Sequence, residues 1–133
     1  MAIGDCRLFK RSPYREMNAT ELKQRTKVFS LRVMKLVDAL PPTLSGKAIG
    51  NQLVRSGTSV GANYRAPCRA RSKAEFIAKI GVVEEEADEG GFWMELIVEG
   101  GLLPLSKVSA LLQAASELTA IMAASRISAA RRS

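Results

Sequence analysis

Residues 55–76 read RSGTSVGANYRAPCRARSKAEF, and they contain the end of one predicted helix and the start of the next. The first of these helices is expected from about Ser45, because small or apolar residues recur there with a 3.6-residue period, at Ile49, Leu53, Gly57, Val60 and Tyr64. Pro67 cannot donate a backbone hydrogen bond to the carbonyl group of Asn63, and its ring crowds that group. The helix is therefore expected to kink or end at Pro67.

The second of these helices has signals at both ends. Ser72 and Glu75 form a Ser-x-x-Glu capping box, which predicts a helix start at about Lys73. Glycines at positions 100 and 101 supply a left-handed cap, and Pro104 is a further stop. The predicted buried stripe of this helix consists of Phe76, Ile80, Val83, Ala87, Gly90, Met94 and Ile97.

Two more helices flank this pair. Asn18 and Glu21 fit an N-cap with its reciprocating carboxylate, and a helix follows with apolar residues at Leu22, Phe29, Val33, Leu36 and Leu40. A fourth helix is expected from about Ser106 to Ala129, with its stripe at Val108, Leu111, Ala115, Leu118 and Met122. Short links between long helices favour antiparallel neighbours. The sequence therefore predicts an all-α fold, an antiparallel up-down-up-down four-helix bundle over residues 18–133, preceded by a basic N-terminal arm over residues 1–17.

The composition excludes several classes of protein. The 133 residues include no His, which removes Ser-His-Asp catalysis and every His-containing metal site. Cys6 and Cys68 do not form a CxxC pair, and we interpret both as reduced thiols. The N-terminus lacks an apolar signal region, and the least charged stretch, residues 108–125, still contains Glu117 and Gln113. We expect a cytoplasmic, non-enzymatic protein without a metal, a cofactor or a membrane segment.

The small residues of the quoted stretch are interpreted as structural. Gly57 and Gly61 are not followed by the Gly-Lys-Ser/Thr end of a phosphate-binding loop, and they lie on or beside the buried stripe. We expect them to let a neighbouring helix approach closely, which would offset the cost of glycine in a helix of about 1 kcal/mol each. Asn63 is expected to be a buried polar residue that satisfies backbone groups freed by Pro67, and the alternative role for Asn63 is a ligand contact.

The chain has a formal net charge of +7, and its basic residues suggest a surface for a polyanion. Arg55, Arg65 and Arg69 are expected within roughly an 80° arc opposite the buried stripe, provided that the helix continues past Pro67. The next helix would extend this charge through Arg71, Lys73 and Lys79. Guanidinium groups suit phosphate oxygens, so these residues are the predicted contacts with RNA or DNA. A solvated charged face is the alternative interpretation.

Acidic residues gather in one segment. Residues 84–101 include seven acidic and no basic side chains. Like charges four residues apart repel one another unless a cation intervenes, and a Mg²⁺ or Mn²⁺ site would need a second carboxylate cluster, which a monomer lacks. We favour salt bridges to arginines of a neighbouring helix or subunit. The predicted oligomer interface contains Glu85, Asp88, Glu89 and Trp93, in a head-to-tail contact that closes into a ring if the rotation permits.

The central part of the chain resembles the four-helix-bundle family of 23S ribosomal RNA intervening-sequence proteins. The resemblance covers about residues 27–127 and includes the Arg-Ser-Gly-x-Ser-Val-x-x-Asn signature, here Arg55, Ser56, Gly57, Ser59, Val60 and Asn63. Ser72, Glu75 and Phe76 fit the family's start of the third helix, with Arg71 one residue out of register. The usual Asn-x-x-Glu-Gly ending of the second helix is replaced by NYRAPC at residues 63–68, so any role of that ending does not transfer.

The resemblance implies an antiparallel four-helix bundle that assembles as a homopentameric ring without enzymatic activity. The family includes the accessory variability protein of diversity-generating retroelements, which is similar to this chain in fold and charge and binds a reverse transcriptase and nucleic acid. The expected partners are thus further copies of the chain, RNA or DNA, and a reverse transcriptase or another protein. The alternative function is a protein–protein interaction scaffold whose basic residues form inter-subunit salt bridges.

Overall fold

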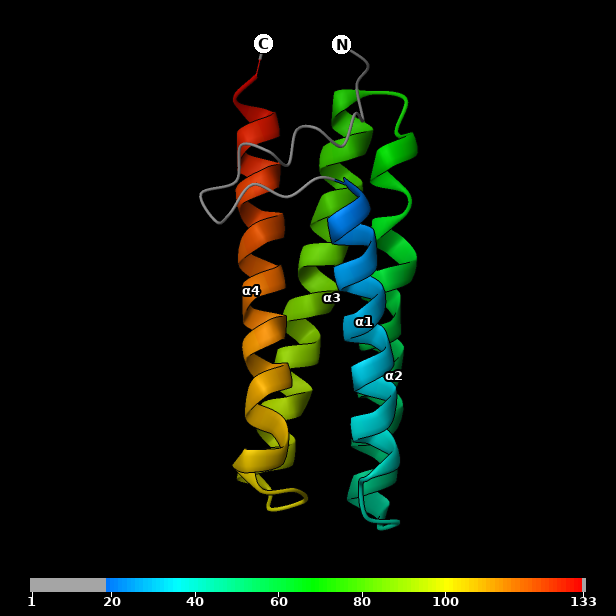
Figure 1. The fold of residues 1–133 in the computed structure, drawn as a ribbon, viewed down its shortest axis with the longest axis vertical. Coiled ribbons are helices and arrows are strands. Elements are labelled where there is room, and N and C mark those ends of the chain that lie inside the picture. The colour runs from blue at the N-terminus through cyan, green and yellow to red at the C-terminus, as the bar shows by residue number, and fades with distance from the viewer. Residues whose placement is uncertain (1–18, 133) are drawn as a thin grey trace.

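The computed structural model describes residues 19–132, which form four long α-helices, one short 3-10 helix and no strand (Figure 1). The long helices are α1 (Ala19–Asp38), α2 (Leu44–Tyr64), α3 (Lys73–Glu99) and α4 (Leu105–Ala130), and the 3-10 helix is η2 (Pro67–Arg69). The all-α prediction is confirmed for this range. The predicted basic arm over residues 1–17 and the predicted N-cap at Asn18 lie outside the described residues.

The long helices lie side by side, and each packs mainly on the helices that directly precede or follow it in the chain. Contacts are extensive between α1 and α2, between α2 and α3, and between α3 and α4, whereas α1 and α4 contact each other much less. In Figure 1 the chain runs down α1, up α2, down α3 and up α4. These features are consistent with the predicted up-down-up-down bundle.

The helix boundaries follow from local hydrogen bonds. At the start of α3 the Ser72 hydroxyl accepts a hydrogen bond from the Glu75 N–H at 3.1 Å, as the capping box predicts. The Glu75 carboxylate accepts a hydrogen bond from the N–H of Arg71 at 3.4 Å. In an ideal capping box it would accept from the N–H of the N-cap residue, here Ser72. At the other end, Gly101 has a φ of +73°, a left-handed conformation that an L residue adopts only with strain.

The connection between α2 and α3 confirms the prediction that the second helix is interrupted at Pro67. The last residue of α2 is Tyr64, and the carbonyl of Asn63 accepts a hydrogen bond from the Ala66 N–H at 3.1 Å. Pro67 then begins η2, a position where its missing N–H costs nothing. The Asn63 side chain is half-buried rather than buried as expected.

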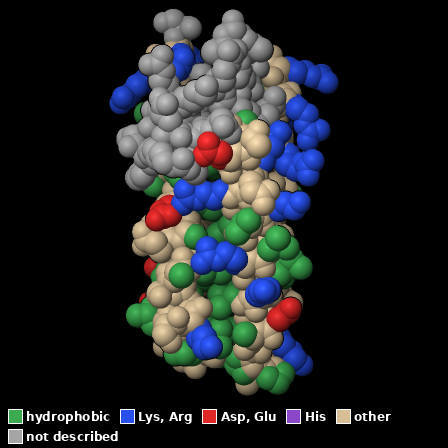
Figure 2. All heavy atoms as spheres, in the orientation of Figure 1, with side chains coloured by type: hydrophobic (Ala, Val, Ile, Leu, Met, Phe, Trp, Pro, Cys, Tyr) green, Lys and Arg blue, Asp and Glu red, His purple; other side chains and the backbone are tan. Residues whose placement is uncertain are grey.

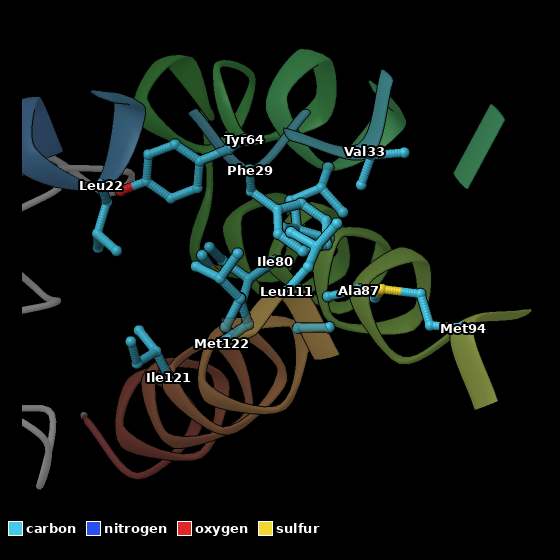
Figure 3. Close-up of a cluster of buried hydrophobic side chains, with 14 of the residues drawn as sticks. Leu22, Phe29, Val33, Tyr64, Ile80, Ala87, Met94, Leu111, Ile121 and Met122 are labelled. Atoms are coloured by element: carbon cyan, nitrogen blue, oxygen red, sulfur yellow. The ribbon is translucent and has the colours of Figure 1, made fainter. Parts of the chain in front are cut away.

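The core draws side chains from every long helix, and Figure 3 shows them converging between the ribbons. The predicted stripes are buried, except that Leu40 and Ile49 are only partly so. Burial raises the pKa of the Tyr64 phenol above its ordinary value, because the anion would lose its hydration. The largest fully buried side chains are Tyr64, Phe29, Phe76, Leu22, Leu53, Ile80, Met94, Ile97, Leu118, Met122 and Val33.

Helices α1 and α2 meet at two glycines. A Cβ atom on Gly57 would lie 2.6 Å from Cγ1 of Val33, and one on Gly61 would lie 2.7 Å from Oγ of Ser30. The Ser30 hydroxyl donates a hydrogen bond to the carbonyl of Gly57 at 2.9 Å, which links the two helices directly. This geometry leaves no room for a larger residue at either glycine without a shift of the neighbouring atoms.

Helix α4 is the most apolar of the four long helices. Within residues 19–132 it is the one helix whose length and composition would allow it to cross a membrane. A buried core helix meets the same criteria, and one side of α4 is buried at Val108, Leu111, Leu118 and Met122. Burial within the chain covers 39% of the most apolar window of α4, so packing accounts for part of its apolar character.

Candidate nucleic-acid interface

A groove between α1 and α2 gathers basic side chains. It encloses about 580 Å³. Lys23 and Lys27 line it from α1, and Arg65 lies just beyond the end of α2. The remaining lining residues are uncharged and mostly small or polar, namely Thr20, Gln24, Ser30, Thr58, Gly61 and Ala62. The described lining is thus cationic, with hydroxyl and amide groups between the charges.

The position of these charges follows from the helix geometry. Lys23 and Lys27 are four residues apart and therefore project from the same side of α1, next to the buried Leu22 and Thr26. The close approach of α1 to α2 brings this side of α1 beside Arg65. Lys23, Lys27 and Arg65 are exposed and form no ion pair with any other residue that the structure describes. Their charges are available to an external anion.

A second basic cluster lies at the connection between α2 and α3. Arg69, Arg71 and Lys79 surround a shallow hollow of about 400 Å³ together with Glu75. The Lys79 ammonium group lies 3.8 Å from the Glu75 carboxylate, so one of the three cations is partly neutralised. Arg69 and Arg71 remain exposed. Figure 2 shows Lys and Arg side chains gathered along the upper right edge of the molecule, beside α2.

Arg55 does not belong to either cluster. Its guanidinium group forms ion pairs with Glu86, at 3.3 Å, and with Glu89, both on α3 of the same chain. Because α2 ends at Tyr64, Arg69 lies on η2 and not on the same helix as Arg55. The predicted arc of Arg55, Arg65 and Arg69 required a continuous helix, so the arc is wrong.

The predicted contact residues other than Arg55 fall into three places. Arg65 lines the groove between α1 and α2, and Arg69, Arg71 and Lys79 form the cluster at the α2–α3 connection. Lys73 is half-buried and donates a hydrogen bond to the backbone carbonyl of Arg132. Lys23 and Lys27 line the groove but were not among the predicted contact residues. The i,i+4 spacing of the two lysines beside the buried stripe of α1 can be recognised in the sequence. Their proximity to Arg65 across the groove cannot, because it depends on how α1 packs on α2.

Several acidic residues of α3 are used inside the chain. Arg126 Nε donates to Glu84 at 2.7 Å, and this hydrogen bond raises the pKa of Arg126 above its ordinary value. Glu89 binds Arg55 and also accepts a hydrogen bond from the Trp93 indole at 3.3 Å. Of the predicted interface residues, Glu89 and Trp93 thus have partners within the chain, whereas Glu85 and Asp88 are exposed.

The comparisons with known proteins agree with this architecture. Residues 18–124 match the family model described as 23S rRNA-intervening sequence protein. The chain belongs to this family. A crystal structure of a protein of unknown function, from the S23 ribosomal protein family of Bacteroides thetaiotaomicron, is similar with 28% sequence identity and a TM-score of 0.71. The similarity covers 76% of this chain and 94% of that chain. A search of curated proteins found no match.

In this member of the 23S rRNA-intervening sequence protein family, the described lining of the α1–α2 groove offers positive charge. In the part of the chain that the structure describes, no three or more His, Cys, Asp or Glu side chains are grouped so that they could hold a metal ion. The chemistry available in the α1–α2 groove is electrostatic attraction together with hydrogen bonding. Both suit the phosphate backbone of a nucleic acid.

Proposed function

We propose that this protein is a non-catalytic, ring-forming helical bundle of the cytoplasm that binds RNA or DNA through the α1–α2 groove. The observation that carries the proposal is the set of three cations, Lys23, Lys27 and Arg65, without a described carboxylate partner. Cations that neutralise phosphates release bound counterions, which drives binding of either nucleic acid. Ser30, Thr58 and Gln24 add hydroxyl and amide groups that can bond to phosphate oxygens.

The cluster at the α2–α3 connection would extend this surface. Arg69 and Arg71 follow Arg65 closely in the chain, so a single phosphate backbone can contact the groove and the hollow together. The role we infer is accessory to a partner protein, and a reverse transcriptase is the partner that the family resemblance suggests. Assembly into a ring, a pentamer by the same resemblance, would repeat the basic surface around the particle.

A second candidate function is a protein–protein interaction scaffold. The ion pairs of Arg55 with Glu86 and of Arg126 with Glu84 favour it, because they use arginines to join helices rather than to bind a ligand. Lys23, Lys27 and Arg65 have no comparable role among the described residues. The two candidates therefore differ in what they expect of these three side chains.

The test compares two matched double variants. Lys23→Ala/Lys27→Ala removes two charges from the groove, and Lys47→Ala/Lys107→Ala removes two exposed lysines from the starts of α2 and α4, at the bottom of Figure 1. Binding of a duplex DNA and a structured RNA is measured from about 50 to 200 mM salt. We expect the groove variant to bind more weakly and to reduce the slope of log K against log salt by about 2, roughly 1 for each phosphate contact.

The control variant should retain the affinity and the salt slope of the unmodified protein. Equal losses in the two double variants would show that only the net charge matters and would overturn the groove as the binding site. Retained binding in the groove variant would favour the scaffold. Light scattering tests the ring, because a particle with the mass of one 14.4 kDa chain would contradict assembly.

A further inference from the structure

The outer surfaces of α1 and α3 differ in charge but share exposed apolar side chains. The groove between α3 and α4 encloses about 850 Å³, which makes it larger than the basic groove between α1 and α2. Its floor consists of small residues of both helices, and the carboxylates of Asp88 and Glu95 stand beside Phe92, whose side chain is 49% exposed. Neither carboxylate forms an ion pair with another residue that the structure describes. The groove is therefore lined by small apolar residues and by polar side chains, among them Ser116, Thr119 and Gln113, and it has an acidic margin.

The α3–α4 groove also contains a glycine that packing within the chain does not explain. A Cβ atom on Gly91 would lie 4.0 Å from its nearest neighbour, Cδ1 of Leu112, so an alanine would fit. Glycine in a helix interior costs about 1 kcal/mol relative to alanine. At Gly57 the contact with Val33 requires glycine, whereas no contact among the described residues requires it at Gly91. A small residue at this position keeps the groove open.

Helix α1 presents the complementary surface. We define the α1 outer stripe as Val28, Leu31, Arg32 and Lys35, whose i, i+3, i+4 and i+7 spacing places them on one side of the helix. Val28 is 40% exposed and Leu31 is 52% exposed, and both basic residues are exposed. Arg32 and Lys35 form no ion pair with another described residue. Figure 2, which views the side of α1 and α4, shows hydrophobic and basic side chains interspersed there.

We propose that the α1 outer stripe of one copy docks into the α3–α4 groove of a second copy. A helix binds a groove through apolar anchors at i, i+3, i+4 and i+7, which is the spacing of the stripe. Arg32 and Lys35 would meet Asp88 and Glu95, so charge complementarity selects the orientation as well as the partner. Because the two surfaces are different parts of one chain, the contact is head-to-tail and can close into a ring.

This inference rests on the assembly part of the proposed function and is independent of the nucleic-acid groove. The stripe and the groove that it would enter contain none of Lys23, Lys27 and Arg65. The residues changed to test the docking are therefore different from the three cations of the basic groove. Loss of assembly and loss of nucleic-acid binding are consequently separable by mutation.

The test uses charge reversal on each surface and on both together. Variant one is Arg32→Glu/Lys35→Glu, variant two is Asp88→Lys/Glu95→Lys, and variant three combines all four changes. Multi-angle light scattering measures the particle mass over a dilution series, and circular dichroism checks that helix content is kept. Like charges across an interface cost several kcal/mol, so we expect variants one and two to need at least tenfold higher concentration to assemble. Variant three should assemble like the unmodified protein.

The matched control is Lys47→Glu/Lys107→Glu, which applies the same change of charge to exposed lysines outside both surfaces. It should leave assembly unchanged. If the unmodified protein assembles and variant one or variant two assembles equally well, the docking is wrong while a ring through other surfaces stands. If variant three fails to recover while its helix content is intact, the charge pairing is wrong. A monomeric unmodified protein would overturn both the docking and the ring, but not the nucleic-acid site.

Discussion

The contact between α1 and α2 and the contact between α3 and α4 use glycine in opposite ways. On α2, Cβ atoms at Gly57 and Gly61 would come within 2.6 Å and 2.7 Å of side-chain atoms of α1. On α3, Cβ atoms at Gly81 and Gly91 would lie 4.0 Å from their nearest neighbours on α4, Cδ of Arg126 and Cδ1 of Leu112. The first pair of glycines permits close packing within the chain. The second pair leaves space at the surface. Glycine therefore allows close packing between α1 and α2, whereas between α3 and α4 it leaves room for a side chain.

The grooves at these two helix contacts also differ in the sign of their charge. The α1–α2 groove is lined by basic residues, and the α3–α4 groove is lined by Asp88 and Glu95. The first suits a polyanion, and the second suits a basic helix. Two grooves on one bundle can thus select different partners, because their charges differ in sign.

The largest expected effect concerns the glycines. Gly57→Ala should lower the free energy of unfolding by about 1–3 kcal/mol, because the new methyl group would overlap Val33, a stiff β-branched residue. Gly81→Ala has Cδ of Arg126 as its nearest neighbour at 4.0 Å and should raise that free energy, by up to about 1 kcal/mol, through helix propensity. Urea unfolding followed by circular dichroism measures both. A gain of stability in both variants would contradict the proposed difference between the close contact at Gly57 and the open space at Gly81.

A smaller effect is expected from the pair of Gly61 and Ser30. Gly61→Ala alone should be destabilising, because its Cβ would lie 2.7 Å from the Ser30 hydroxyl oxygen. In a Ser30→Ala background that overlap is absent, so the second change should cost less. A double-mutant cycle should give a coupling energy of about 0.5–1.5 kcal/mol. Additive effects would mean that α1 and α2 adjust without strain at this point.

The smallest effect is expected from Arg55. Its ion pairs with Glu86 and Glu89 join α2 to α3, but its side chain is 53% exposed. Arg55→Ala should therefore lower the free energy of unfolding by about 1 kcal/mol or less, with a smaller loss at high salt. Nucleic-acid affinity should change less than in Lys23→Ala/Lys27→Ala. A larger loss of affinity from Arg55→Ala would indicate that Arg55 contacts the nucleic acid, as the sequence predicted.

The local features of the fold were predictable from the sequence because their causes lie within a few residues. Ser72 with Glu75 determines where α3 begins, Pro67 prevents α2 from continuing, and Gly101 adopts the left-handed conformation that ends α3. The N-cap of α2 was missed. Thr43 accepts a hydrogen bond from the Gly46 N–H at 3.0 Å, a role that two preceding prolines and no acidic residue at the third helical position made hard to recognise.

The candidate site was less predictable because it depends on how helices are rotated against each other. A helical projection places Arg55 on the outside of α2, but it does not show that Glu86 and Glu89 of α3 stand within reach. Lys23 and Lys27 became relevant only when the packing of α1 on α2 placed them beside Arg65. Periodicity identifies the buried side of each helix, whereas the partners of the exposed side depend on contacts between distant segments.

The slight contact between α1 and α4 bears on how the chain reaches its fold. Nearly all packing joins helices that are consecutive in the chain, and the closure of the first helix on the last adds little. Proteins dominated by such near-neighbour contacts fold rapidly, because little loop-closure entropy is lost before packing begins. During synthesis, α2 can pack on α1 as soon as it leaves the ribosome, and α3 and α4 can follow in turn. Each helix from α2 onward would then emerge after the helix on which it packs has already been synthesised.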